Sequence, residues 1–224
     1  MPSPLLSVTM KKRVAILISG RGSNMQALVE AARAPDYPAE IVLVASNRPE
    51  AAGLVWAREH DIPTRIVDHT AYASREKFEA QLEEALAAER IDLVCLAGFM
   101  RLLSTSMVDT WRDRMLNIHP SLLPAFRGLR THERALAAGV KIAGCTVHLV
   151  RPEVDTGPII AQAAVPVLET DTPDTLAARV LAAEHRIYPQ ALAAFASGRA
   201  TVEGDHVRLA VAVNQSASLF SPAL

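Results

Sequence analysis

The feature that most constrains the fold is a series of short, continuous apolar segments, each followed by a segment with helical spacing. Strands that are buried on both faces of a parallel sheet have such continuous apolar sequences, because helices cover both sides. The alternation therefore predicts βαβ units in an α/β fold: an open, twisted, mostly parallel sheet with helices on both faces. The apolar segments are residues 14–18, 40–46, 64–67 and 93–97, and the helical segments are 25–34, 49–60, 74–90 and 104–112.

The second half of the chain has a different pattern. Two apolar segments, 142–150 and 158–167, are joined by a turn-rich loop without a helix between them, which predicts an antiparallel pair added to the same sheet. A short helix is expected at 131–138 and a long one at 172–197, where Pro189 predicts a kink or a break. Residues 201–209 are typical of a small hairpin that turns at Gly204-Asp205.

These patterns predict a single domain over residues 12–203. Its N-terminal half would be about 12–112 and its C-terminal half about 113–203, with flexible termini at 1–11 and 210–224. At 224 residues the chain is long enough to bury a substantial core. Only 4% of the residues are aromatic, so we expect that core to consist mainly of Ala, Val, Leu and Ile.

Composition also excludes several classes of function. The formal net charge is −1 and no long basic run occurs, which argues against nucleic-acid binding. The two cysteines, Cys95 and Cys145, lie in apolar segments without metal-ligand spacing, and we expect buried thiols rather than a metal site. No apolar run reaches the roughly 18 residues of a membrane span, and no secretory signal is recognisable. A cytoplasmic location is therefore expected.

A glycine-containing loop, residues 18–24 (Ile-Ser-Gly-Arg-Gly-Ser-Asn), lies between the first strand and the first helix. Backbone N–H groups at such a helix N-terminus favour an anion. The loop lacks the third glycine of the dinucleotide fingerprint and the Gly-Lys-Ser/Thr of a Walker loop, so a phosphate monoester is the better prediction. The alternative is a tight turn in which Ser23 or Asn24 is the N-cap.

Asn117 and His119 are two residues apart at the end of an apolar segment, where a strand would direct both side chains to one face. Pro120 would end that strand, and open α/β sheets carry their chemistry at strand ends. Taken alone, the pair is also compatible with turn and capping residues. Asp155 by itself is equally compatible with a turn. Beside His119, however, its carboxylate would fix the tautomer and favour the imidazolium.

Together, an amide, an imidazole and a carboxylate could stabilise an oxyanion and shuttle protons. No serine or cysteine lies in the context of a nucleophile elbow. The attacking group would therefore belong to the substrate.

Four motifs occur in order, and as a set they are specific. They are residues 18–24, 96–103 (Leu-Ala-Gly-Phe-Met-Arg-Leu-Leu), 117–124 (Asn-Ile-His-Pro-Ser-Leu-Leu-Pro) and 155–158 (Asp-Thr-Gly-Pro). The set resembles the phosphoribosylglycinamide formyltransferases over residues 12 to about 202. The resemblance implies a Rossmann-like formyltransferase fold. It also implies formyl transfer from 10-formyltetrahydrofolate to the amine of glycinamide ribonucleotide, in de novo purine synthesis. It further implies small-molecule substrates and no metal, and it allows a homodimer.

The resemblance also implies residue roles. Asn117 and His119 would be the catalytic pair that donates to the oxyanion, and Asp155 would support His119. The residues expected at the ribonucleotide are Gly22, Ser23 and Asn24 at the phosphate and Glu184 at the ribose hydroxyls. The residues expected at the folate are Arg75 at the glutamate tail, and the backbone of Met100, Arg101, Leu102, Leu103, Arg151, Pro152, Glu153 and Val154 around the pterin. His148 matches a family histidine, and we expect a satisfied structural role for it.

Three alternatives remain. A 10-formyltetrahydrofolate hydrolase would use the same three residues with water in place of the amine, and it would be expected to carry an N-terminal regulatory domain. A methionyl-tRNA formyltransferase is suggested by Phe126-Arg127-Gly128. Many family members carry Lys-Tyr-Pro-Gly or a similar segment where this chain has Ala125-Phe126-Arg127-Gly128. It should bring a C-terminal RNA-binding domain and a basic surface. A folate-binding module without activity is disfavoured because Asn117, His119 and Asp155 are retained together.

Overall fold

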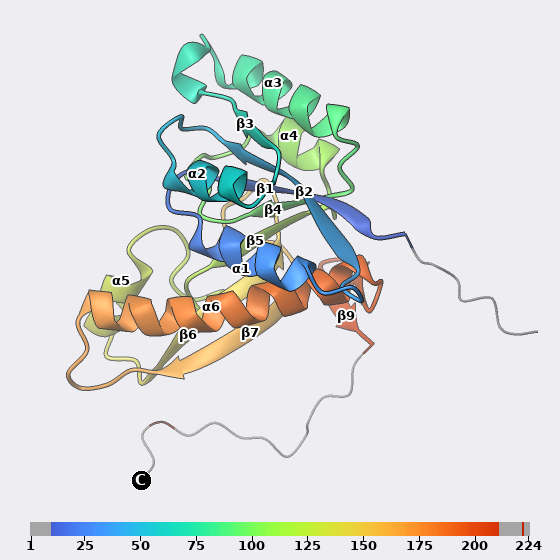
Figure 1. The fold of residues 1–224 in the computed structure, drawn as a ribbon. Coiled ribbons are helices and arrows are strands. Elements are labelled where there is room, and N and C mark those ends of the chain that lie inside the picture. The colour runs from blue at the N-terminus through green and yellow to red at the C-terminus, as the bar shows by residue number, and fades with distance from the viewer. Residues whose placement is uncertain (1–9, 211–220, 222–224) are drawn as a thin grey trace, which may run out of the picture.

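The computed structural model describes residues 10–210 and 221, and its centre is a seven-stranded sheet (Figure 1). The strand order is β3-β2-β1-β4-β5-β6-β7. Strands β1 to β5 pair in parallel, whereas β6 is antiparallel to both β5 and β7. The predicted fold class, a mostly parallel sheet with an antiparallel C-terminal portion, is confirmed. The strands are β1 (Lys12–Ile18), β2 (Ala39–Ser46), β3 (Thr64–Ile66), β4 (Leu93–Leu96), β5 (Met115–His119), β6 (Ile142–Leu149) and β7 (Ile159–Pro166).

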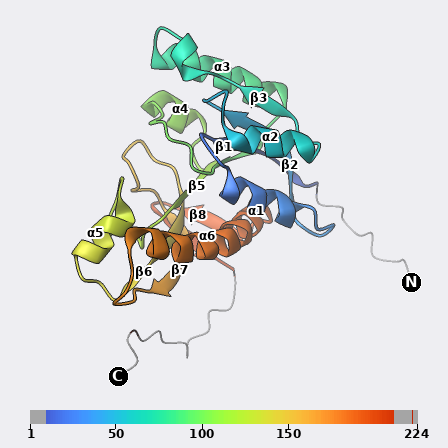
Figure 2. The ribbon, with the colours of Figure 1, turned by 60° about the vertical axis from the view of Figure 1, so that its left-hand side comes forward.

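Helices cover both faces of the sheet (Figures 1 and 2). The helices are α1 (Ser23–Ala32), α2 (Ala52–Glu59), α3 (Arg75–Ala88), α4 (Thr105–Thr110), α5 (Thr131–Ala137) and α6 (Pro173–Ala196), with a short 3₁₀ helix, η1 (His69–Ala71). Alternate residues of β1 enter two separate cores. Ile16 packs with residues of α1, α2 and α6, and Leu17 packs on the opposite face with residues of α3 and α4. This double burial explains why the strand has no polar position between Val14 and Ile18.

The strand order reverses between β1 and β4, and the loops after these two strands touch. The Ser19 N–H donates to the Gly98 carbonyl at 3.2 Å, and the Ser19 hydroxyl accepts the Met100 N–H at 2.7 Å. In open α/β sheets, ligands bind outside the carboxyl ends of the strands at such a reversal. The glycine-containing loop and the 97–103 segment therefore meet where this rule expects a substrate.

The long helix α6 lies beside α1 and continues through Pro189 as one element, so the predicted break is wrong (Figure 2). The Pro189 carbonyl accepts the Tyr37 hydroxyl at 2.7 Å. Strands β8 (Ala200–Glu203) and β9 (His206–Leu209) form the predicted hairpin. The expected flexible termini lie almost entirely outside the described residues. Within residues 10–210 and 221, the helices are too short or too polar to cross a membrane.

Candidate active site

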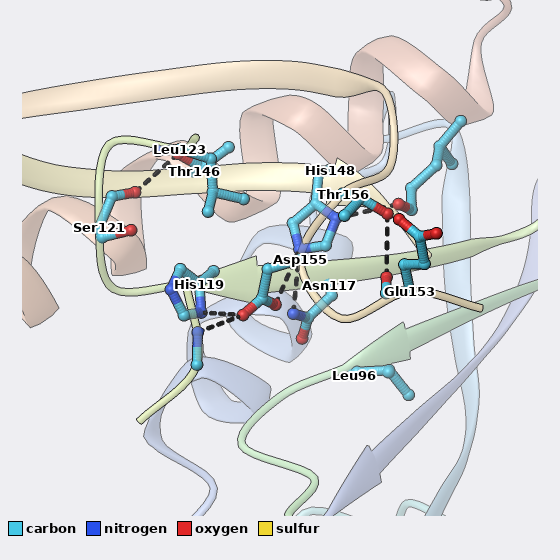
Figure 3. Close-up of polar contacts among 12 residues, drawn as sticks. Leu96, Asn117, His119, Ser121, Leu123, Thr146, His148, Glu153, Asp155 and Thr156 are labelled. Atoms are coloured by element: carbon cyan, nitrogen blue, oxygen red, sulfur yellow. Dashed lines mark hydrogen bonds and ion pairs between the residues drawn. The ribbon is translucent and has the colours of Figure 1, made fainter. Parts of the chain in front are cut away.

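Strand pairing brings the first three polar side chains together. Asn117 and His119 lie on one face of β5, and the antiparallel register sets His148 of β6 opposite Asn117. The Asn117 Nδ2 lies 3.2 Å from His148 Nε2. The loop after β6 then returns Asp155 to the same place, and Figure 3 shows its carboxylate between the two imidazoles. We call Asn117, His119, His148 and Asp155 the Asp155 cluster.

Asp155 is the centre of this cluster, and its side chain is only 9% exposed. One carboxylate oxygen, Oδ2, lies 3.4 Å from His119 Nδ1 and accepts the Gly128 N–H at 2.8 Å. The other, Oδ1, lies 3.7 Å from His148 Nε2. The backbone of Asp155 is left-handed (φ 55°), a conformation that Asp tolerates better than most residues. The structure thus brings the three predicted catalytic residues together.

The neighbours of the two histidines indicate where their protons lie. His119 Nε2 lies 3.1 Å from the Phe126 carbonyl, an acceptor, so this nitrogen carries a proton, while Nδ1 lies 3.4 Å from Asp155 Oδ2. His148 Nδ1 faces the Leu149 carbonyl at 2.9 Å. Burial lowers the pKa of His148, which favours a neutral ring with its proton on Nδ1. His148 Nε2 is then an acceptor, and it fixes the direction of the Asn117 amide.

A short backbone segment, residues 126–129, joins His119 to Asp155. The Phe126 carbonyl accepts from His119, and the Gly128 N–H donates to Asp155. Gly128 has a φ of 79°, which a glycine adopts without strain. From α5, the Arg134 guanidinium donates to the Arg127 carbonyl at 2.5 Å and lies 5.6 Å from the centre of the Phe126 ring. This segment therefore holds the imidazole and the carboxylate in one arrangement.

The loop after β1 presents an open helix N-terminus. Gly22 is the N-cap of α1 with a φ of 73°, and no side chain of the described residues caps this helix. Ser23 is already the first helical residue, so the alternative in which Ser23 or Asn24 is the N-cap is wrong. The first-turn N–H groups and the positive end of the helix dipole are therefore available to an anion.

A residue of α6, from the C-terminal part of the sequence, lies beside the N-terminus of α1. The Asn24 amide donates to Glu184 Oε2 at 2.7 Å, although 160 positions separate the two residues. Glu184 is 6% exposed, and burial raises its carboxyl pKa while the bond from Asn24 opposes that rise. The Asn24 Oδ1 is buried without a hydrogen-bond partner in the described part of the chain. This pair therefore still has hydrogen-bonding capacity for a ligand.

The segment after β4, residues 97–103, is fixed at both ends and is apolar between them except for Arg101. Its Met100 N–H is already bonded to Ser19, so one of the predicted backbone contacts to the pterin is taken inside the protein. At the far end, buried Glu79 accepts from the Ser104 N–H at 2.7 Å and from its hydroxyl. Met100 and Leu102 are 62% and 65% exposed. Exposed apolar side chains on an anchored backbone fit the flat face of a ring system.

The loop between β6 and β7 lies at the same sheet edge. The Arg151 guanidinium donates to Asp113 at 2.6 Å and to the Val150 carbonyl, so this side chain holds the loop itself. A Cβ on Gly157 would lie 1.7 Å from the Leu149 carbonyl oxygen, and only glycine allows the loop to return so closely. Arg75, predicted at the folate tail, is exposed as the first residue of α3.

Comparison with known proteins agrees with this geometry. A family model described as formyl transferase matches residues 12–192. The chain belongs to the formyl transferase family. It is 44% identical over 186 residues to the phosphoribosylglycinamide formyltransferase of Escherichia coli K12, covering 83% of this chain and 88% of that protein. It superimposes on the crystal structure of glycinamide ribonucleotide transformylase 1 from Symbiobacterium toebii with a TM-score of 0.88 and 50% identity, covering 92% of this chain and 98% of that one. The resemblance predicted from the four motifs is confirmed.

Longer relatives also exist. The chain is 53% identical over 188 residues to the bovine trifunctional purine biosynthetic protein adenosine-3, which covers 84% of this chain and 19% of the relative. It thus spans about a fifth of that protein's length. The structure of a formyltetrahydrofolate deformylase from Pseudomonas syringae is also similar, with 27% identity and a TM-score of 0.83, covering 89% of this chain and 66% of that one.

Two parts of this formyl transferase site were not foreseen from the sequence. His148 was expected to be a structural histidine, yet it contacts both Asn117 and Asp155. Its placement depends on the β5–β6 register, and the available signals were its position in an alternating strand and its match to a family histidine. The Phe126 and Gly128 contacts are made by the backbone, which has no side-chain signature. Within the described residues, no group of three His, Cys, Asp or Glu side chains could hold a metal ion.

Proposed function

We propose that the chain transfers the formyl group of 10-formyltetrahydrofolate to the amine of glycinamide ribonucleotide, as a step of de novo purine biosynthesis. The products are formylglycinamide ribonucleotide and tetrahydrofolate. The observation that carries the proposal is the Asp155 cluster, which lies at the sheet edge that also carries the uncapped N-terminus of α1. The names of the relatives support the same reaction.

In this reaction the folate supplies a formyl carbon bonded to a nitrogen that can leave. Negative charge develops on the formyl oxygen when the ribonucleotide amine attacks, and donors aimed at that oxygen lower the barrier. Asn117 Nδ2 carries two hydrogens, and His148 accepts only one of them. We assign the other to the formyl oxygen, and we assign the His119 Nε2–H to the same oxygen once the substrate takes the place of the Phe126 carbonyl. One such donor typically contributes about 10²–10³ in turnover.

Asp155 would keep His119 cationic and hold its orientation, since its Oδ2 faces the ring nitrogen. The proton that the amine loses would reach the folate nitrogen through His119 or a bound water. Both imidazoles are buried and the Asp155 side chain is 9% exposed, which strengthens these charge interactions.

Substrate binding would be divided between two regions. The open N-terminus of α1, with Gly22, Ser23 and Asn24, would hold the phosphate, and the Glu184 carboxylate would accept from the ribose hydroxyls. The pterin would lie between the segments 100–103 and 151–154, with Arg75 at the glutamate tail. The exposed apolar side chains of Met100 and Leu102 support this position for the ring. A homodimer and a cytoplasmic location stay predictions.

A spectroscopic assay of 10-formyl folate, with and without glycinamide ribonucleotide, tests the proposal. We expect folate turnover to depend on the ribonucleotide. Turnover at the same rate without it would contradict the transferase and favour 10-formyltetrahydrofolate hydrolysis, the alternative suggested by the similarity to the deformylase. The open phosphate region at α1 favours the transferase, because the hydrolase has no phosphorylated acceptor to hold.

A further inference from the structure

Tyr188 is a fully buried tyrosine of α6 whose hydroxyl contacts two strands at once. Its side chain is 0% exposed, and its Oη lies 3.1 Å from the Leu96 carbonyl oxygen and 3.1 Å from the Leu116 carbonyl oxygen. Leu96 ends β4, and Leu116 is the second residue of the adjacent β5. A hydroxyl has one proton, so the two carbonyls share a single donor.

The two carbonyls belong to peptide groups that lead directly into the site. The Leu116 carbonyl belongs to the peptide that joins Leu116 to Asn117. The Leu96 carbonyl belongs to the peptide that joins Leu96 to the 97–103 segment. Because a peptide group is planar, fixing the direction of its carbonyl also fixes the start of the next residue. The Tyr188 hydroxyl therefore constrains the backbone at Asn117 and at the beginning of the expected folate segment.

The same helix face also reaches the ribonucleotide region. Glu184 precedes Tyr188 by four residues, which places both on one face of α6, and Glu184 accepts the Asn24 amide at 2.7 Å. Burial raises the pKa of Tyr188 well above its usual value, and the neighbouring Cys95 thiol adds to the rise. The hydroxyl consequently keeps its proton and remains a donor.

We propose that Tyr188 is a positioning residue. It fixes Asn117 and the 97–103 segment in position relative to the ribonucleotide held at Glu184. This inference rests on the proposed function. Tyr188 would touch neither substrate and act only through the Leu96 and Leu116 carbonyls. Both carbonyls belong to the paired β4–β5 ladder, so removing the hydroxyl takes away the donor that α6 adds, and we expect the ends of β4 and β5 to shift. The groups that bind the ribonucleotide stay in place, while the Asn117 amide moves away from the reacting oxygen.

The chain offers a matched control in Tyr37. Its hydroxyl donates to the Pro189 carbonyl at 2.7 Å, on the same helix and one residue beyond Tyr188. Burial raises the pKa of Tyr37 as well, so it is also a protonated donor. Tyr37→Phe removes one hydrogen bond to α6, as Tyr188→Phe does, but leaves the donor to β4 and β5 intact. A loss of helix docking alone would affect both variants.

The experiment compares steady-state kinetics of the wild type, Tyr188→Phe and Tyr37→Phe in the formyl transfer assay. Ribonucleotide titration sets the concentration of folded sites, and circular dichroism checks the fold at the assay temperature, which is kept low. For Tyr188→Phe we expect kcat to fall about 10- to 100-fold, because small displacements of catalytic groups have large effects on rate. We expect both KM values of Tyr188→Phe, and the kcat of Tyr37→Phe, to stay within about twofold of the wild type.

Three results would overturn the inference. They are an unchanged kcat in Tyr188→Phe, an equal loss in Tyr37→Phe, and a Tyr188→Phe chain that does not fold even at low temperature. The last result would make the hydroxyl a requirement of the fold itself. Failure of the proposed function is distinguishable, since the wild type would then show no ribonucleotide-dependent turnover. Turnover in the wild type with any of the three results refutes the role of Tyr188 alone.

Discussion

The chain buries two carboxylates near its expected substrates, and it satisfies them to different degrees. Asp155 accepts the Gly128 N–H and faces an imidazole on each side. Glu184 accepts from Asn24, whose own amide oxygen is buried without a partner in the described part of the chain. Burying a charged or polar group costs free energy unless hydrogen bonds compensate. The Asp155 cluster is therefore arranged before a substrate arrives, whereas the Asn24–Glu184 pair is completed by a ligand.

This difference separates the two kinetic constants. Changes in the Asp155 cluster should alter groups that act in the transition state, and so lower kcat. Changes at the Asn24–Glu184 pair should alter groups that hold the ribonucleotide in every state, and so raise its KM. A variant of the Asp155 cluster that raised only KM, or a variant of the Asn24–Glu184 pair that lowered only kcat, would contradict this division.

The largest effect is expected for His119→Ala. The substitution removes the imidazolium that we assign to the formyl oxygen, and it leaves Asp155 without that neighbour. We expect kcat to fall by at least about 10²–10³, the usual loss for one oxyanion donor. Ribonucleotide binding, measured by calorimetry, should survive. Near-normal turnover in His119→Ala would show that the imidazole has no part in the reaction.

Asp155→Asn should have the next largest effect. Asparagine also tolerates a left-handed backbone and can still accept the Gly128 N–H, but it lacks the charge beside His119. We expect kcat to fall about 10²-fold, because the imidazolium loses its counter-charge. Asp36→Asn, at an exposed position, is the matched control and should leave steady-state kinetics unchanged. A rise in the ribonucleotide KM with an unchanged kcat would contradict this role, because it would make Asp155 a ribonucleotide-binding residue.

Glu184→Gln tests the other carboxylate. The ribonucleotide KM should rise about tenfold, since a neutral amide is a weaker acceptor for ribose hydroxyls than a carboxylate. Initial-rate measurements at varied ribonucleotide concentration check this value. A kcat that fell while KM stayed constant would contradict the expected role.

The free energy of unfolding of the same variant should also differ from that of the wild type in a way that depends on pH. Burial raises the pKa of Glu184 in the folded chain above its ordinary value of 4.5. The stability linked to this group is therefore full below 4.5 and is lost as pH rises through the folded-state pKa. The glutamine in Glu184→Gln does not titrate. The free energy of unfolding of this variant, measured relative to that of the wild type, should therefore increase as pH rises. Urea denaturation at about pH 4 and about pH 8 measures this difference.

Gly128→Ala should have the smallest effect. A Cβ would meet nothing within 4 Å, but the φ of 79° strains any residue other than glycine. We expect a loss of about 1 kcal/mol in the free energy of unfolding. A fewfold loss in kcat should accompany it, because the Gly128 N–H holds Asp155. Gly139→Ala is the control, with a φ of 68° and equally open space at the end of α5, and it should lose stability alone.

The parts of the site that the sequence could predict are those built from neighbouring residues. The open N-terminus of α1 depends on a loop of seven residues, and the shared face of Asn117 and His119 follows from the period of a strand. The sheet was predictable for the same reason, because each βαβ unit carries its own alternation. Local rules sufficed wherever the contacts themselves are local.

The remaining contacts depend on how distant segments meet. Asp155 lies in the loop that returns to β7 past Gly157, where nothing larger than glycine fits against the Leu149 carbonyl. His148 meets Asn117 through a strand register that the sequence does not specify. Before the structure, the role of Asp155 therefore came from a resemblance and not from its surroundings. The roles of the cluster stay predictions until the variants are measured.

The 160 positions between Asn24 and Glu184 have a consequence for the chain during its synthesis. The glycine-containing loop leaves the ribosome 160 positions before its partner on α6. A nascent chain has no complete ribonucleotide site until that helix has docked. Substrate can stabilise only the finished domain, so the growing polypeptide must reach its native topology without help from the molecule that it will bind.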